Sequence, residues 1–191
     1  MDKRIPARTL VVVPYDQMIR NLFKTMDSPA TTRIHAAVGI SGEAAELIVA
    51  SSIENIVEEL GDIEFYVEAY YQAIGGRRSK LADELALEVN DPCGHQVLGT
   101  VTIAISSTAG RLLDLTKKSW VYEKPFDDNA ERAIRYELLR LEVMMSQVRE
   151  MIGVRQADVL GANQGKLGKR YPDGVYTDKA AQERLDKPEG E

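Results

Sequence analysis

The segments HAAVGISGEAAEL (residues 35–47) and EELGDIEFY (residues 58–66) decide the fold of this chain. They carry two pairs of acids: Glu43 with Glu46, and Glu59 with Asp62. The i,i+3 spacing of each pair puts both carboxylates on one face of a helix. Twelve residues separate the pairs, enough to reverse the chain and lay the second helix against the first. Four carboxylates that converge between two helices need cations, so the pattern predicts a divalent-metal site.

The first acidic pair lies in residues 31–52, a segment of small and apolar residues without proline that predicts one helix. Inside it, from residue 36 to residue 50, Glu43 and Glu46 are the only charged residues. Along one side of the helix they line up with three small residues: Ala36, Gly39 and Ala50. Charges on a helix usually form a solvated face, but isolated acids among small residues favour an inward-facing site.

The second acidic pair lies in a helix predicted over residues 53–74 and ended by Gly75–Gly76. The apolar stripe of this helix consists of Ile56, Leu60, Ile63 and Val67. Glu59 and Asp62 flank that stripe. Three further acids point elsewhere and are expected to be solvated charges: Glu58, Glu64 and Glu68.

The rest of the chain also predicts helices. We expect a polar helix and turn over residues 77–95, a strongly apolar stretch over 97–115, a long amphipathic helix over 130–152 and a shorter helix over 156–169. The only short β-branched run, residues 10–13, stops at Pro14. The predicted fold class is therefore all-α.

An internal repeat relates the two apolar stretches. Residues 40–48 align with residues 105–113, and the pattern from Ile56 to Glu64 aligns with that from Ile134 to Glu142. Three acids change in the second copy and one is kept: Glu43 becomes Thr108, Glu46 becomes Arg111, Asp62 becomes Arg140, and Glu59 remains as Glu137. Chance similarity between amphipathic helices is the alternative, but the ordered match favours a duplication whose second half has lost its metal ligands.

Two fused helical hairpins predict a pseudo-symmetric helical bundle. We expect one domain over residues 1–187, with repeat 1 over 31–76, a linker over 77–96 and a degenerate repeat 2 over 97–153. A C-terminal helix and turn follow over 154–175, and residues 176–191 form a charged tail.

The acidic pattern resembles the signature of the all-α nucleoside triphosphate pyrophosphohydrolases, the superfamily of MazG-like enzymes and dimeric dUTPases. Two further segments resemble the family: KKSWVYEKP (residues 117–125) and ANQGKLGKRYPDG (residues 162–174). The resemblance covers residues 15–187, leaving 77–94 as linker. Most MazG-like chains carry one copy of the helix pair, so a fused and inactive second copy looks more like the dimeric dUTPase arrangement.

The resemblance implies that a nucleoside triphosphate is cleaved to the monophosphate and pyrophosphate. It implies Mg²⁺, with Mn²⁺ as the alternative, held by Glu43, Glu46, Glu59 and Asp62. Glu46 or Glu43 is the first choice for the residue that activates water, although sequence does not separate base from ligand.

Residues for the remainder of the substrate follow from the same resemblance. Asn163, Lys166 and Arg170 stand at i, i+3 and i+7, and are expected to contact phosphates; a solvated surface row is the alternative. His35 either has a structural role or lines a base pocket. Tyr66, Trp120 and Tyr122 either stack on a base or belong to the core.

Composition limits the other functions. The formal net charge of -6 argues against a nucleic-acid partner. Cys93 is the only cysteine, which excludes an intrachain disulfide and a cysteine-based zinc site and is expected to be a buried thiol. Without an apolar leader or a membrane-length apolar run, we expect a cytoplasmic protein with no membrane contact.

The substrate, the presence of turnover and the assembly stay open at this point, whereas one rival site is excluded. The substrate is expected to be a deoxynucleoside triphosphate, either dUTP or dCTP, or a purine nucleotide such as dGTP. A ferritin-like di-iron site is excluded because neither histidine stands in a Glu-x-x-His motif. A helical module that binds nucleotides or a partner without turnover is the main alternative to an enzyme. A homo-oligomer, in the simplest case a dimer, is also expected.

Overall fold

The computed structural model describes residues 13–76, 78, 97–184 and 186, and this part of the chain is helical without strands. The all-α prediction is therefore confirmed for these residues. The helices are α1 (Tyr15–Leu22), α2 (Pro29–Val49), α3 (Ile53–Ala73), α5 (Leu98–Val121), α6 (Asp128–Ile152), α7 (Gln156–Arg170) and α8 (Asp178–Glu183).

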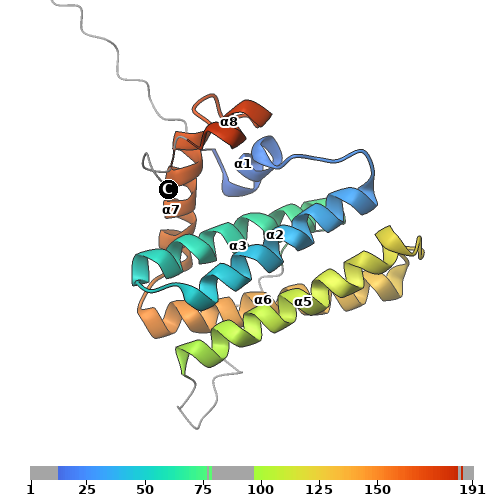
Figure 1. The fold of residues 1–191 in the computed structure, drawn as a ribbon, viewed down its shortest axis with the longest axis horizontal. Coiled ribbons are helices and arrows are strands. Elements are labelled where there is room, and N and C mark those ends of the chain that lie inside the picture. Colours follow the sequence, from blue (N-terminus) through green and yellow to red (C-terminus); the bar gives the residue numbers. More distant parts are fainter. Residues whose placement is uncertain (1–12, 77, 79–96, 185, 187–191) are drawn as a thin grey trace, which may run out of the picture.

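Four long helices form the body of the molecule (Figure 1). Helix α2 packs against both α3 and α5, and α5 packs against α6. Helix α7 runs across the direction of these four helices and packs on α3, while α1 and α8 lie above α3 at the same end. Residues of α1, α7 and α8 line the same pocket as the acids of the α2–α3 hairpin.

Capping residues set the limits of the α2–α3 hairpin. The Ser28 side chain accepts a hydrogen bond from the Thr31 backbone, and Pro29 follows as the first helical residue of α2. Ser52 caps α3 in the same way, through the backbone of Asn55. Only residues 50–52 separate the two helices, so they must be antiparallel neighbours.

Apolar core positions that the sequence alignment pairs have the same burial in the two hairpins. Ile40 and Ile105 are both fully buried, and so are Ala44 with Ala109 and Leu60 with Leu138. These residues belong to one hydrophobic cluster that fills the space between α2, α3, α5 and α6. Burial of each isoleucine or leucine side chain contributes about 1.5–3 kcal/mol to the gross stabilisation of the bundle.

The prediction that Glu64 is a solvated charge was wrong. Its side chain is fully buried, and it accepts hydrogen bonds from Arg149 on α6 at 3.1 Å and from Gln156 on α7 at 3.1 Å. Arg78 forms an ion pair with Glu64. It also pairs at 2.6 Å with Glu142, which is the residue aligned with Glu64 in the repeat. Burial alone would raise the pKa of Glu64, but the two arginines outweigh it and hold the pKa below its ordinary value.

The structure adds two helices that the sequence patterns do not predict. Helix α1 precedes the first hairpin, and α8 lies within residues 176–191, where only a charged tail was expected. The expected helix over 77–95 and the thiol of Cys93 lie outside the described residues, apart from Arg78. No helix in the described part of the chain is both long and apolar enough to cross a membrane.

Candidate active site

Three of the four predicted acids come together where α2 lies against α3. Carboxylate oxygens of Glu43, Glu46 and Glu59 lie within 4.8 Å of one another. We call these three residues the carboxylate cluster. Glu46 is exposed and the other two are half-buried, so the cluster opens to solvent on one side. This spacing allows one oxygen from each residue to reach the same cation, and oxygen is the donor that Mg²⁺ prefers.

Two glycines allow the helices to approach at this place. A Cβ atom on Gly39 would lie 2.4 Å from the ring of Tyr66, so only glycine lets that ring lie against α2. A Cβ atom on Gly61 would lie 2.9 Å from the Cβ of Asn163, so glycine also lets α7 approach α3 beside Asp62. The small residue at 39 was part of the predicted packing stripe; the role of Gly61 was not predicted.

Burial and the closeness of like charges govern the electrostatics of the carboxylate cluster, and Lys166 offsets them only in part. Burial raises the pKa of Glu43 to about 8, with further contributions from Asp62, Glu46 and Glu59. Burial and the neighbouring acids likewise raise the pKa of Glu59 to about 7. At neutral pH the cluster therefore retains protons, and a divalent cation would release them.

Asp62, the fourth predicted ligand, is held by α7. It forms an ion pair with Lys166 and accepts a hydrogen bond from the Asn163 side chain at 2.7 Å. Asn163 is buried, and its side-chain oxygen accepts a hydrogen bond from the Tyr15 hydroxyl at 2.9 Å. Tyr15 thus fixes the orientation of the Asn163 amide. The sequence patterns missed Tyr15, because nothing in its segment predicts contact with α7.

Lys166 also forms an ion pair with Glu58 at 3.1 Å, so Glu58 is not simply a solvated charge. Of the three residues expected to contact phosphates, only Arg170 lines the pocket beside the acids. In the structure Asn163 and Lys166 position Asp62 instead.

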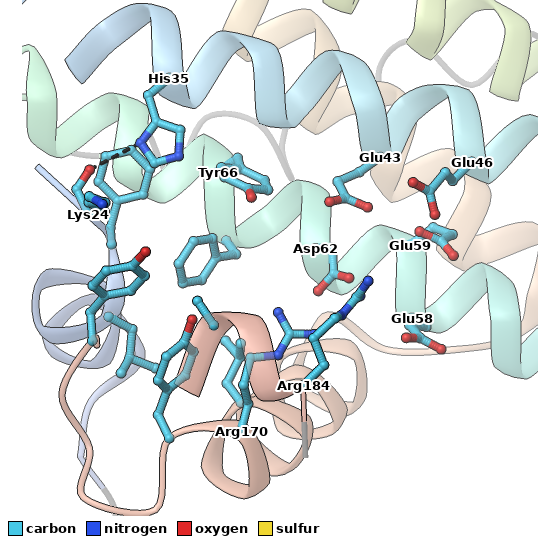
Figure 2. Close-up of a pocket in the computed structure, with 17 residues that line it drawn as sticks. Lys24, His35, Glu43, Glu46, Glu58, Glu59, Asp62, Tyr66, Arg170 and Arg184 are labelled. Carbon is cyan, nitrogen blue, oxygen red and sulfur yellow. Dashed lines mark hydrogen bonds between the residues drawn. The ribbon is translucent and has the colours of Figure 1, made fainter. Parts of the chain in front are cut away.

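The carboxylate cluster forms one end of a pocket of about 410 Å³ (Figure 2). Glu58 and Asp62 also line that end, together with Arg170 and Arg184. The opposite end, which we call the aromatic end, is lined by Phe23, His35, Phe65, Tyr66, Tyr171 and Tyr176. The pocket therefore joins a strongly acidic region to a region of aromatic rings beside which Lys24 also lies.

His35 and Tyr66, both predicted as candidate base-contacting residues, lie at the aromatic end. The His35 Nδ1 atom is 3.0 Å from the Lys24 carbonyl oxygen, and because a carbonyl only accepts, Nδ1 carries the hydrogen. The imidazole stacks on Phe23 with 4.6 Å between ring centroids. Burial and the nearby Glu43 and Asp62 raise the pKa of Tyr66 to about 12, so its hydroxyl stays protonated.

Two other aromatic residues do not reach this pocket. Trp120 and Tyr122, at the end of α5, are exposed at 49% and 60%. The prediction that they belong to the core is therefore wrong, and neither of them lines this pocket.

The equivalent position in the second hairpin shows what replaces the acids. Arg111 donates to Glu137 at 3.3 Å and to Thr108 at 2.7 Å. Arg140 donates to the same Glu137 oxygen at 3.4 Å. Glu137, the only one of the four predicted ligand positions that stays acidic in the second copy, is thus neutralised by two arginines of the chain itself. The first hairpin has three clustered carboxylates and no arginine of α2 or α3 among the residues that line its pocket.

A scan against models of known protein families matches none, and searches of curated proteins and of solved structures find no match either. Function is therefore argued from the pocket and its residues.

Proposed function

We propose that this protein is a Mg²⁺-dependent nucleoside triphosphate pyrophosphohydrolase. It would convert a nucleoside triphosphate, most readily a deoxynucleotide, to the monophosphate and pyrophosphate. One observation carries the proposal: a single pocket joins three carboxylates within 4.8 Å of one another to an end lined by aromatic rings. A cation-bound polyphosphate suits the first end, and a nucleobase suits the second.

The comparison between the two hairpins supports a metal at the first site. In the second hairpin the chain supplies Arg111 and Arg140 to the remaining acid. In the first hairpin the corresponding positions are Glu46 and Asp62, and the raised pKa values of Glu43 and Glu59 mark a cluster short of positive charge. A bound divalent cation would neutralise the carboxylates, and their oxygen donors fit Mg²⁺ or Mn²⁺.

Glu43, Glu46 and Glu59 would hold the cation, with Asp62 beside them. When bound, the cation supplies positive charge to the phosphate oxygens. Asn163 and Lys166 keep the Asp62 carboxylate in place through the bonds that they donate to it. The rings at the aromatic end hold the base, which orients the α-phosphorus toward the acids.

A water molecule would attack the α-phosphorus, and the bond from that phosphorus to the oxygen bridging the β-phosphorus would break. Glu46 or Glu43 would accept the proton of this water. Glu46 is the exposed member of the carboxylate cluster, which leaves it accessible to water, whereas Glu43 is half-buried. Negative charge builds up on the leaving pyrophosphate, and Arg170 and Arg184, which line the pocket, would stabilise it.

Pyrophosphate release from a panel of deoxynucleoside and ribonucleoside triphosphates tests this proposal. With Mg²⁺ or Mn²⁺ we expect release from at least one nucleotide, with the monophosphate as the other product. The panel also separates dUTP, dCTP and dGTP as substrates. Nucleotide binding without release from any member would favour the non-enzymatic binding module instead. Sedimentation of the same sample tests the homodimer that we propose as the working assembly.

A further inference from the structure

The pocket contains an arginine that is already bound to a carboxylate of the same chain. Arg170 ends α7 and lines the pocket at its acidic end. Its Nε and Nη2 atoms each donate a hydrogen bond of 2.6 Å to one carboxylate oxygen of Asp186. The Asp186 side chain is 1% exposed and that of Arg170 is 18% exposed. This is a bidentate, largely dehydrated pair that borders a cavity.

The segment that brings Asp186 to this place is lightly attached. It begins with α8, which has only six residues, none of them buried. Two alanines of α8, Ala180 and Ala181, pack against the small cluster of Leu22, Leu167 and Tyr171. The ion pair between Lys24 and Asp178 adds a second attachment, but both of its side chains are exposed, and such pairs contribute little. Arg184 adopts a positive φ of 46°, a left-handed conformation that is unfavourable for a residue other than glycine.

A guanidinium group binds a carboxylate and a phosphate with the same two-bond geometry. Arg184 lines the pocket beside Arg170, and Figure 2 shows both side chains across from the carboxylates of α2 and α3. No ion-pair partner of Arg184 is found among the described residues. Two arginines therefore border the place where a polyphosphate bound to the carboxylate cluster would end.

We propose that Arg170 forms a subsite for a phosphate group of the ligand, and that Asp186 occupies this subsite in the free chain and competes with the phosphate. The identity of the ligand rests on the proposed function, but the competition is a property of these two side chains. Because Asp186 belongs to the same chain, its effective concentration at Arg170 is high. A phosphate group binds only to the fraction of molecules in which Asp186 has left, so Asp186 lowers the apparent affinity.

Binding of inorganic triphosphate, measured by titration calorimetry in the presence of Mg²⁺, tests the competition directly. Asp186→Asn keeps the size of the side chain and removes its charge, and we expect it to bind inorganic triphosphate about tenfold more tightly than the wild type. Asp178→Asn is the matched control: it breaks the other ion pair of the same segment and should leave the affinity unchanged. The double variant Arg170→Gln/Asp186→Asn should lose the gain.

Equal or weaker binding by Asp186→Asn would overturn the proposal, as would an equal gain in Asp178→Asn. NMR of the wild type gives a second test that needs no variant. Addition of inorganic triphosphate should shift the Arg170 Nε–H signal together with the backbone signals of residues 177–184; an unchanged Arg170 signal at saturation contradicts the competition. Neither test uses a nucleotide or turnover. A protein that hydrolyses no nucleotide can still show the competition, so the two proposals fail separately.

Discussion

Removing one acid from each hairpin should have opposite effects on stability. Glu59→Gln removes a member of the carboxylate cluster, and Glu137→Gln removes the aligned acid of the second hairpin. Glu59 lies among acids that raise its pKa to about 7, whereas Glu137 accepts bonds from Arg111 and Arg140. Without divalent cations at pH 8, we expect Glu59→Gln to stabilise the protein and Glu137→Gln to destabilise it.

The magnitudes follow from the two environments. Glu59 has a pKa of 4.5 in the unfolded chain and about 7 in the folded protein. Its ionisation therefore destabilises the folded protein as the pH rises above 4.5, and the full effect is reached above about pH 7. A rise from 4.5 to about 7 corresponds to at most roughly 3.4 kcal/mol, which solvent screening at this half-buried side chain reduces to about 1–2 kcal/mol. The arginine side chains at Glu137 are 43% and 42% exposed, so loss of that charge costs about 1 kcal/mol.

Thermal unfolding in EDTA and in Mg²⁺ measures both effects. For a chain of this length, 1 kcal/mol shifts the midpoint by about 2–4 °C. In EDTA at pH 8 we expect a rise of roughly 2–8 °C for Glu59→Gln and a fall of roughly 2–4 °C for Glu137→Gln. At pH 4 the Glu59→Gln effect should nearly vanish, because Glu59 is then mostly protonated in both the folded and the unfolded chain. Mg²⁺ at a hundred times its dissociation constant adds about 2.7 kcal/mol to the wild type and to Glu137→Gln.

Glu59→Gln should lose most of the stabilisation by Mg²⁺. If Glu59→Gln lowers the midpoint in EDTA, the acids do not repel one another as described. If Mg²⁺ stabilises Glu59→Gln as much as the wild type, Glu59 is not a ligand. If both variants lose the Mg²⁺ effect equally, the distinction between the two hairpins is wrong.

Three further predictions concern protons, packing and the buried ion pairs. Mg²⁺ affinity should rise from pH 6 to 8, and Mg²⁺ binding at pH 7 should release protons, because the pKa values of Glu43 and Glu59 are raised to about 8 and about 7. Calorimetry in two buffers of different ionisation enthalpy measures the released protons, and no release would contradict the prediction. Gly39→Ala should lower stability by about 1–3 kcal/mol because its Cβ would meet the Tyr66 ring, whereas Gly42→Ala, whose Cβ meets nothing, should raise it by about 0.5–1 kcal/mol; denaturant unfolding with equal signs for both refutes the packing argument. Glu64→Gln should cost about 3–5 kcal/mol, since it leaves Arg78 and Arg149 beside a neutral side chain in a buried site; a loss below 1 kcal/mol by the same method contradicts the buried pairs.

The long helices could be predicted from sequence because their apolar residues repeat with the helical period. The predicted helix over 53–74 and the observed α3, Ile53–Ala73, differ by one residue. The predicted helix over 31–52 differs more, because Ser28 and Pro29 begin α2 earlier and Ser52 already caps α3. Local spacing also predicted that Glu43, Glu46 and Glu59 lie together, since this depends only on two adjacent helices.

What the sequence did not predict depends on how distant segments dock. Glu64 was taken for a solvated charge because its own helix gives no sign that α6 and α7 cover it. The ion pair between Lys166 and Asp62 requires α7 to cross α3 at Gly61. Tyr15 acts through a contact with Asn163, 148 residues further along the chain, and Asp186 folds back onto Arg170, 16 residues before it; no periodic pattern marks either residue.

The central claim is that the first hairpin cleaves a nucleoside triphosphate at the α-phosphorus. Hydrolysis of the best nucleotide in ¹⁸O-labelled water with Mg²⁺, followed by ³¹P NMR of the products, tests it most directly. We predict pyrophosphate and a monophosphate as the only products, with the label in the monophosphate. Asp62→Asn should abolish the reaction, and Glu137→Gln should leave it nearly unchanged. Label in the pyrophosphate, equal loss in both variants, or no hydrolysis of any nucleotide with Mg²⁺ or Mn²⁺ would contradict the claim.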